Sequence, residues 1–472
     1  MAASVSHAQL GDHFEQYAWA HSLEWGYYKH PPVPTWLLSG LIHVFGPSIW
    51  LTYVLSALFN AGTAIFTFLI ARKLFGTPTA ALAVLLWGLD FKYSFRAEWW
   101  NHNTTMIFFV AMTVWLVMRA VLRKNLGWWL AAGIAAGLSL LSKYQAVIPL
   151  FGIIFSLWHS SALRKPEHRR GLALAATTAA LVFLPHLLWA VAHDFSTLKY
   201  ASQENVHPGL LARLRSMLSF SLIQVRMLFP AIVCMALAAL WLRYRPQAPL
   251  TANSENPSEN PLLPRQSWLF GLFLIPLAAV MSTALLVGLE LHDHWGFQTM
   301  QFFPLILGWR FRKLLRIGLA RWFGLVLVTH SMSMLVYAQA TLHPHGGGRH
   351  DPSYPAREIA QAVVRDWHSI TNCPLRYVVG PSFEAGMISI YSGQFPAVLE
   401  NNQPALSPWI DMHQLQQAGA VYVEIEAPTH AVKHTSFPFE LPGSDEKRNL
   451  VMHWSIVAPE ACDPTATPPT LN

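Results

Sequence analysis

Residues 104–122 read TTMIFFVAMTVWLVMRAVL, a run that contains a single charge, Arg119. About 20 apolar residues in a helix span the roughly 30 Å hydrocarbon core of a bilayer. Further apolar runs occupy residues 49–71, 77–92, 127–142, 145–162, 171–192, 218–243, 268–290, 298–311 and 316–340. These runs predict an all-α polytopic membrane protein with about ten transmembrane helices, in which 127–162 forms either two crossings or one broken hairpin.

The composition of the whole chain points to the same class. Its 472 residues are 53% hydrophobic and 12% charged, whereas charged residues make up about 25% of a typical soluble protein. The net charge of +7 does not indicate nucleic-acid binding, because most Lys and Arg residues lie in short loops between apolar runs. By the positive-inside rule those basic loops face the cytoplasm, so the loops between them are predicted to be extracytoplasmic.

This topology divides the chain into three predicted regions. Ordinary soluble composition returns after the His-Gly-Gly-Gly linker at 345–348, where a helix at 355–370 precedes short β-runs at 375–379, 420–425 and 451–457. The predicted regions are a first extracytoplasmic loop (1–48), a transmembrane helical domain (49–341), and a small extracytoplasmic α/β domain (342–472) whose tail from 463 is disordered.

Two features of the chain are left open by the sequence. Residues 1–11 contain neither a signal peptide nor a transmembrane helix, although the topology places them outside. Either one helix is missing at the N-terminus, which we expect, or the short segment is translocated without a signal. Cys234 lies in an apolar run, which leaves Cys373 and Cys462 as the one pair available for a disulfide.

The residues best suited to chemistry gather in the first loop. A transferase that acts on a lipid-linked substrate needs a carboxylate base, cations for a phosphate leaving group, and aromatic surface for a sugar and an isoprenoid chain. An interfacial amphipathic helix with solvated charges explains the same composition. The side chains concerned are Asp12, His13, Glu15, Trp25, Tyr27, Tyr28, Lys29 and His30.

This loop resembles the polyprenyl-phosphate-dependent glycosyltransferases of family 39, in the GT-C superfamily. That family includes protein O-mannosyltransferases that use dolichyl- or polyprenyl-phosphate mannose, and it resembles the bacterial aminoarabinose transferase of lipid A. The resemblance covers most of the chain. It rests on Asp12 ahead of Trp25-Gly26-Tyr27-Tyr28-Lys29-His30-Pro31-Pro32, on Asn101-His102-Asn103-Thr104, and on residues 137–144, 375–380 and 407–411.

The resemblance implies a role for several of these positions. Asp12 matches the catalytic carboxylate that accepts the acceptor's proton, His13 takes the place of the family's second acid, and Glu15 lies one helical turn from Asp12. His30 matches a position near the lipid phosphate, and Lys29 beside it carries a permanent charge that suits the same task.

Other candidates come from the residues themselves. Lys143 sits between two apolar stretches, where an unneeded charge is costly, so it either binds phosphate or snorkels to the interface. Glu290, His292, Asp293 and His294 suggest zinc ligands, but a juxtamembrane polar turn is the preferred interpretation. We assign donor-phosphate binding to Lys29, His30, Lys143 and Arg96, and substrate binding to Tyr27, Tyr28, Trp25, His102, Asn103, Tyr144 and His294.

We therefore predict a glycosyltransferase of the hexosyl or pentosyl class, multi-pass in a bacterial inner membrane, with its active site and C-terminal domain facing the periplasm. It moves a sugar from a polyprenyl-phosphate donor to a hydroxyl of lipid A, another glycan or a protein. No cofactor is expected, a divalent metal stays open, and nucleic acid is not a partner. The alternatives are a transporter or flippase for lipid-linked sugars and a catalytically inactive scaffold relative.

Overall fold

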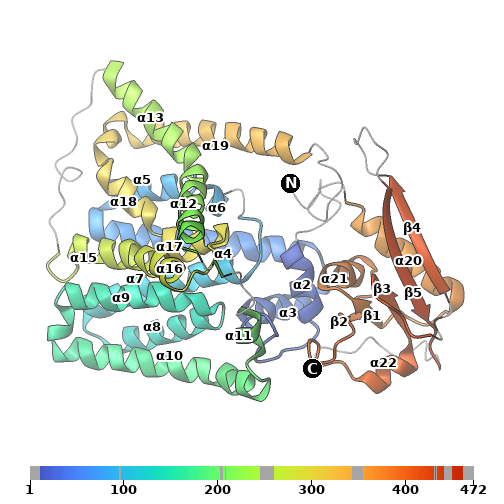
Figure 1. Ribbon diagram of the computed structural model, residues 1–472. Coiled ribbons are helices and arrows are strands. Elements are labelled where there is room, and N and C mark those ends of the chain that lie inside the picture. The colour runs from blue at the N-terminus through green and yellow to red at the C-terminus, as the bar shows by residue number, and fades with distance from the viewer. Residues whose placement is uncertain are drawn as a thin grey trace.

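The computed structural model describes residues 11–94, 97–201, 206–207, 209–244, 260–342, 354–429, 431, 433–440 and 449–460. Long helices form one end of the molecule and a β-sheet forms the other, with α2 (Gly11–Trp19) and α3 (Val33–Phe45) between them (Figure 1). The first loop predicted from the sequence is thus a helical layer that joins the two ends.

Among the described residues, five helices are long and apolar enough to cross a membrane. A sixth candidate is the pair α12 (Leu210–Met227) and α13 (Phe229–Tyr244), which bends by 53°. The other described helices in predicted spans are shorter, so about ten crossings stays a prediction. The five are α4 (Trp50–Phe75), α7 (His102–Arg123), α10 (Pro166–Ala192), the run α15 (Arg265–Leu269), η3 (Phe270–Leu274) and α16 (Ile275–Leu286), and α19 (Leu319–Leu342); the shorter ones include α5 (Thr77–Trp87), α8 (Leu126–Leu140), α9 (Val147–His159) and α18 (Phe303–Arg310).

Helix α7 is the centre of the helical end. In its most apolar window 72% of the residues are buried inside the protein, compared with 22% for α10 and 11% for α19. Both α4 and α8 pack against it. Because α10 and α19 instead present leucine and valine side chains outward, these two helices form the lipid-facing periphery.

The sheet occupies the C-terminal part of the chain, which we call the C-terminal module (described residues 354–460). Its strand order is β2-β1-β3-β5-β4, with β1 parallel to β2 and β3, and β5 antiparallel to β3 and β4. The elements are α20 (Ala356–Ile370), β1 (Tyr377–Gly380), α21 (Ser382–Tyr391), β2 (Ala397–Glu400), α22 (Met412–Ala418), β3 (Ala420–Val423), β4 (Lys433–Glu440) and β5 (Asn449–Val457).

The expected helix at 355–370 coincides with α20, and the three expected β-runs overlap β1, β3 and β5; β2 and β4 were not predicted. The boundary of a separate extracytoplasmic domain stays a prediction. Cys373 is disulfide-bonded and Cys234 is free and buried, whereas Cys462, the linker at 345–348 and the tail from 463 lie outside the described residues.

Helix α2 is buried rather than solvated. Phe14, Tyr17 and Trp19 have no exposed side-chain surface, and the Phe14 ring meets Phe383 of α21 edge to face with centroids 5.1 Å apart. The aromatic face of α2 is therefore covered by the C-terminal module and does not lie free at an interface, while Asp12 on the same helix stays exposed.

Candidate active site

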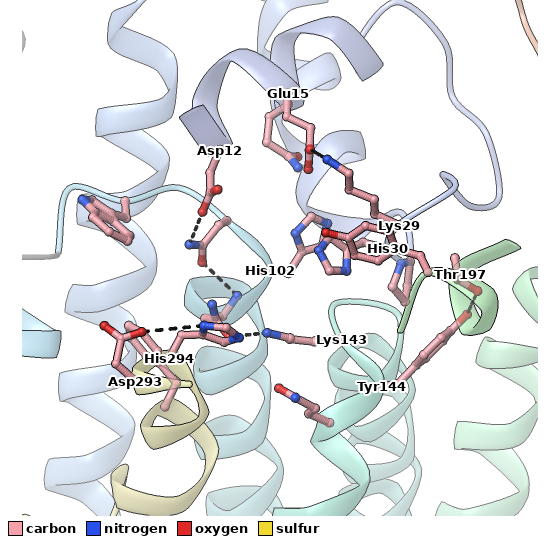
Figure 2. Close-up of a pocket in the computed structure, with 18 residues that line it drawn as sticks. Asp12, Glu15, Lys29, His30, His102, Lys143, Tyr144, Thr197, Asp293 and His294 are labelled. Atoms are coloured by element: carbon pink, nitrogen blue, oxygen red, sulfur yellow. Dashed lines mark hydrogen bonds and ion pairs between the residues drawn. The ribbon is translucent and has the colours of Figure 1, made fainter. Parts of the chain in front are cut away.

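A cavity of about 430 Å³ lies where α2 and its following loop meet the N-terminal end of α7 and the turn before α9 (Figure 2). Its walls come from segments that are distant in the sequence. They are lined by Asp12, Glu15, Gln16, Lys29, His30, Pro31, Trp99, Asn101, His102, Asn103, Lys143, Tyr144, Gln145, Thr197, Tyr200, Asp293, His294 and Phe297.

Asp12 is oriented by the residue that caps α7. The side-chain carbonyl of Asn101 accepts hydrogen bonds from the backbone N–H groups of Asn103 (2.9 Å) and Thr104 (3.2 Å), which is the N-cap interaction that begins many helices. The amide nitrogen of Asn101 must then face the other way, and it donates to Asp12 Oδ2 at 2.8 Å. Asp12 itself is exposed, so its carboxylate is accessible as well as oriented.

Glu15 and Lys29 form an ion pair in the cavity wall. Burial raises the pKa of Glu15 to about 7, although Lys29 acts in the opposite direction. Burial alone would lower the pKa of Lys29, but Glu15, Tyr28 and Glu400 together hold it above its usual value. Lys29 is therefore a permanent cation at neutral pH, while Glu15 changes charge there.

His30 and His102 both line the cavity and lie in contact with each other, with ring centroids 3.9 Å apart. Burial, with His102 and Lys143 nearby, lowers the pKa of His30 well below its usual value, so His30 is neutral at pH 7 and contributes hydrogen bonding rather than charge. The Nε2 atom of His102 is buried and has no hydrogen-bond partner among the described residues. A polar ligand in the cavity would supply the missing partner.

Lys143 brings a second cation to the cavity. Its ammonium group donates to the side-chain oxygen of Asn103 at 2.9 Å, and Asn103 is itself bonded through its backbone to the cap residue Asn101. Asp12, Asn101, Asn103 and Lys143 thus form one connected row (Figure 2). The prospective base and the second cation are held by the same helix terminus.

Tyr144 is fixed by two further contacts. Its hydroxyl lies 2.6 Å from His186 Nε2 and 2.7 Å from Thr197 Oγ1, and His186 Nδ1 lies 2.6 Å from the carbonyl oxygen of Trp25. These contacts join α10 and α11 (Ser196–Ala201) to the loop between α2 and α3 (residues 20–32), which we call the aromatic loop. The cavity wall on this side is therefore tied to the lipid-facing periphery.

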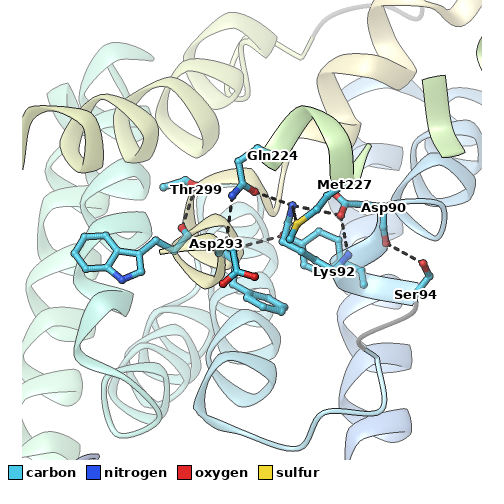
Figure 3. A network of polar contacts seen from close by, with 10 residues as sticks. Asp90, Lys92, Ser94, Gln224, Met227, Asp293 and Thr299 are labelled. Carbon is cyan, nitrogen blue, oxygen red and sulfur yellow. Dashed lines mark hydrogen bonds and ion pairs between the residues drawn. The ribbon is translucent and has the colours of Figure 1, made fainter. Parts of the chain in front are cut away.

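A buried polar network supports the wall that contains Asp293 and His294 (Figure 3). Lys92 and Asp90 form an ion pair at 3.3 Å with no exposed side-chain surface. Lys92 also donates to the side-chain oxygen of Gln224 at 2.9 Å, and the amide nitrogen of Gln224 donates to the carbonyl oxygen of Asp293 at 3.2 Å. Charges buried this deeply are costly, and this pair fixes α12 against the cavity wall.

Some predicted site residues lie outside the cavity lining. His13 points to the opposite side of α2, where its Nε2 accepts from the backbone N–H of Trp100 and its Nδ1 lies 3.3 Å from Thr52 Oγ1; burial lowers its pKa to about 4. His13 is thus a neutral packing residue. Arg96 lies outside the described residues.

The remaining aromatic residues of the loop also surround the cavity rather than line it. Tyr27 is buried, donates to the carbonyl of Ser22 and stacks on Trp19. Tyr28 bonds Glu400 of the C-terminal module, and Trp25 is exposed against Trp36. The other predicted residues, which are Asp12, Glu15, Lys29, His30, His102, Asn103, Lys143, Tyr144 and His294, line the cavity together.

Several lining residues were missed by the sequence reasoning. Asn101 directly precedes an apolar helix, which is the position of an N-cap residue. It belongs to a motif named above, but no role was predicted for it. Gln16 follows Asp12 by four positions and so shares its face of α2. No local pattern marks Thr197. For zinc, the described residues contain no group of three or more His, Cys, Asp or Glu side chains arranged to hold a metal ion.

Comparisons with known proteins agree on one family. Residues 29–189 match the family model described as dolichyl-phosphate-mannose-protein mannosyltransferase. The lipid A galacturonosyltransferase RgtD of Rhizobium johnstonii is 26% identical over 240 residues, which are 50% of this chain and 49% of that protein. The undecaprenyl phosphate-alpha-4-amino-4-deoxy-L-arabinose arabinosyl transferase of Pseudomonas savastanoi pv. phaseolicola is 26% identical over 179 residues, 36% of this chain and 32% of that protein. The chain thus spans about half the length, or less, of these curated relatives.

The fold is similar to the crystal structure of ArnT from Cupriavidus metallidurans bound to undecaprenyl phosphate. The TM-score is 0.55 at 13% identity, covering 96% of this chain and 95% of that one, so this likeness concerns the fold alone. With the family model and the relatives, it confirms the predicted resemblance to the family 39 glycosyltransferases. The chain is a polytopic membrane protein with a fold similar to that of ArnT.

Replacing only one partner of the Asp90–Lys92 ion pair should lower the free energy of unfolding much more than replacing both partners together. Lys92→Met leaves the Asp90 carboxylate buried without its cation, so it should lower the free energy of unfolding by about 3–5 kcal/mol. The double variant Asp90→Asn, Lys92→Met keeps an acceptor for the backbone N–H of Lys92 and should recover most of that loss. Denaturation in detergent micelles, followed by tryptophan fluorescence, measures both.

The matched control is Lys124→Met, which removes an exposed ion pair with Glu167 and should leave the unfolding transition where it is. A double variant as unstable as Lys92→Met would contradict the electrostatic explanation.

Proposed function

We propose that this chain is a membrane glycosyltransferase that moves a sugar from a polyprenyl-phosphate donor to a hydroxyl acceptor. The observation that carries the proposal is the cavity row in which one helix cap orients an accessible carboxylate, Asp12, and holds a cation, Lys143. A carboxylate base and a cation for the leaving phosphate are the two groups that such a transfer requires. The names of the relatives, which describe galacturonosyl and arabinosyl transferases, support the same reaction.

The proposed reaction is a single displacement. The acceptor hydroxyl oxygen attacks the anomeric carbon of the donor sugar while Asp12 takes up the hydroxyl proton. The bond between the anomeric carbon and the phosphate oxygen breaks, and its electron pair leaves with the polyprenyl phosphate. One glycosidic bond forms as one sugar–phosphate bond breaks, and the configuration at the anomeric carbon is inverted.

Lys29 and Lys143 are the groups we assign to the leaving phosphate. Charge that develops on the phosphate oxygens is stabilised by fixed cations in a site with little water. His30, neutral at pH 7, and the unpartnered Nε2 of His102 are suited to donate or accept hydrogen bonds from the phosphate or sugar. We infer that the two lysines supply the positive charge and that no cofactor is required.

The acceptor and orientation follow from the relatives and the charge pattern. The curated relatives are named for lipid A and for an undecaprenyl-phosphate sugar, and we propose a lipid A or other glycan hydroxyl as the acceptor, with a protein hydroxyl as the alternative. The basic loops support a periplasmic active site and C-terminal module in a bacterial inner membrane. We further propose that the shorter apolar helices α5, α8 and α9 contribute to the predicted set of about ten crossings.

The first prediction from this mechanism concerns the base. Asp12→Asn keeps the size of the side chain but cannot accept the hydroxyl proton, so turnover should fall by about 10²–10⁴-fold while donor binding persists. The measurement is release of polyprenyl phosphate from a panel of polyprenyl-phosphate sugars in the presence of a membrane lipid extract.

Asp411→Asn is the matched control, since Asp411 caps α22 away from the cavity and Asn is an equally good cap. Wild-type protein that binds donor but releases no lipid phosphate would favour a transporter or a scaffold. Equal turnover in Asp12→Asn and wild type would remove Asp12 as the base.

The second prediction concerns the residue that orients Asp12. Asn101→Asp still accepts the two cap hydrogen bonds, but it has no N–H to donate and sets a second carboxylate against Asp12. The cap hydrogen bonds are therefore kept, but repulsion between two carboxylates at this buried position should lower the free energy of unfolding as well. Turnover should fall by about 10²-fold, as for a misplaced catalytic group. Asn125→Asp makes the same change at the cap of α8 and should leave turnover intact; a similar loss in both variants would refute the assigned role.

The third prediction follows from the pKa of Glu15. Below pH 7 Glu15 becomes protonated and leaves the charge of Lys29 for the donor phosphate, whereas above pH 7 it is ionised and competes for Lys29. If binding requires protonated Glu15, the Kd for a polyprenyl phosphodiester sugar, whose charge is constant in this range, should rise about tenfold from pH 6 to pH 8. Glu15→Gln should bind tightly at both pH values, and a Kd that rises equally in this variant would assign the effect to another group.

A further inference from the structure

We propose that Glu400, at the carboxyl end of β2, is the positioning residue through which the C-terminal module holds Lys29 in place for the donor phosphate. This inference rests on the proposed function, because it assigns Lys29 to that phosphate. Glu400 is 1% exposed and lies outside the cavity lining. It is a positioning residue and not a catalytic one, since it acts through Tyr28.

The carboxylate of Glu400 joins two distant parts of the chain. One oxygen accepts from the hydroxyl of Tyr28 at 2.5 Å and also from the hydroxyl of Ser382, and the other lies 3.3 Å from the indole nitrogen of Trp19. Tyr28 and Trp19 belong to the aromatic loop and α2, whereas Ser382 begins α21 of the C-terminal module. The backbone N–H of Glu400 donates to Ser407 Oγ at 3.0 Å, which fixes the strand end itself.

The contact with Tyr28 reaches Lys29 directly. The ammonium nitrogen of Lys29 lies 5.2 Å from the centroid of the Tyr28 ring and 5.6 Å from that of Tyr200, a geometry typical of cation–π contacts. The Tyr28 hydroxyl is anchored on Glu400, so the ring beneath the ammonium group cannot swing away. The other side of the same carboxylate holds Trp19, which stacks on Tyr27 with centroids 5.0 Å apart.

Attachment of the module does not depend on this carboxylate. Phe14 and Phe383 pack edge to face, and α21 approaches α2 so closely that a Cβ atom on Gly386 would lie 2.4 Å from the carbonyl oxygen of Phe14. This apolar contact docks the module without help from a charge. A buried carboxylate is costly to retain, and two of its three partners here, Tyr28 and Trp19, are aromatic residues that shape the surroundings of Lys29.

The test is a binding measurement on the full-length protein in detergent with undecaprenyl phosphate as the probe. In Glu400→Gln the amide NH₂ faces either the indole N–H of Trp19, whose hydrogen bond is then lost, or the hydroxyl groups of Tyr28 and Ser382, which then lose their charged acceptor. We expect the Kd for undecaprenyl phosphate to rise about tenfold, the KM for the donor to rise similarly, and kcat to change less than about twofold. Glu426→Gln, an exposed carboxylate of the same module, should behave as wild type.

A second variant separates positioning from folding. Tyr28→Phe removes the hydroxyl that bonds Glu400, and the double variant with Glu400→Gln should bind no more weakly than the weaker single variant, because both act through one contact. Phe383→Leu, which loosens the docking of α21, should lower the thermal midpoint with a smaller effect on Kd. If Glu400 were purely structural, Glu400→Gln would behave like Phe383→Leu and lower the thermal midpoint more than it weakens binding.

Several outcomes would overturn the inference. They are a Kd for Glu400→Gln within twofold of wild type, additive effects of Glu400→Gln and Tyr28→Phe, or a loss of binding that follows the thermal midpoint across all variants. If wild type binds undecaprenyl phosphate and Glu400→Gln weakens that binding, the inference stands even where no donor is turned over. In that case the proposed transferase activity alone fails.

Discussion

The structure of the candidate site depends on the two directions in which the Asn101 amide bonds. Its oxygen must satisfy the first N–H groups of α7, the most deeply buried of the long helices, because unpaired N–H groups at a buried helix end are expensive. Its nitrogen is thereby left for Asp12. The cap of the central helix α7 thus sets the orientation of Asp12, the proposed base. Lys143 is held at the same helix terminus through Asn103.

Charged side chains with ion-pair or hydrogen-bond partners support the rest of the cavity wall. Glu15 and Lys29 form one pair in the wall, Asp90 and Lys92 form another behind the opposite wall, and Glu400 contributes a third buried carboxylate from the C-terminal module. These polar groups fix the relative positions of neighbouring segments, which hydrophobic packing alone does not do because apolar contacts have little directionality. The helices set the overall frame, and these polar contacts set the positions of side chains within it.

Much of this arrangement could be predicted from local sequence. The apolar runs located the long helices, and the spacing of Asp12 and Glu15 placed both on one face of α2, as the cavity confirms. The same geometry explains why His13 was misplaced: a neighbour in sequence points about 100° away around a helix, and here that direction is the interior. Asn101 was recognisable as a cap. Glu400 and Thr197 were not, because only the packing of distant segments brings them to the site, and no local period or motif encodes that packing.

The hydrogen bond between Tyr28 and Glu400 connects residues 372 positions apart, which has a consequence for biosynthesis. Ribosomes add about 5–20 residues per second, so the aromatic loop waits on the order of tens of seconds for its partner strand to be made and translocated. During that interval the membrane helices can insert and α7 can be capped, but the wall around Lys29 is incomplete. A chain truncated before Glu400 would therefore reach the bilayer without a finished wall around Lys29, and β2 of the C-terminal module would complete it.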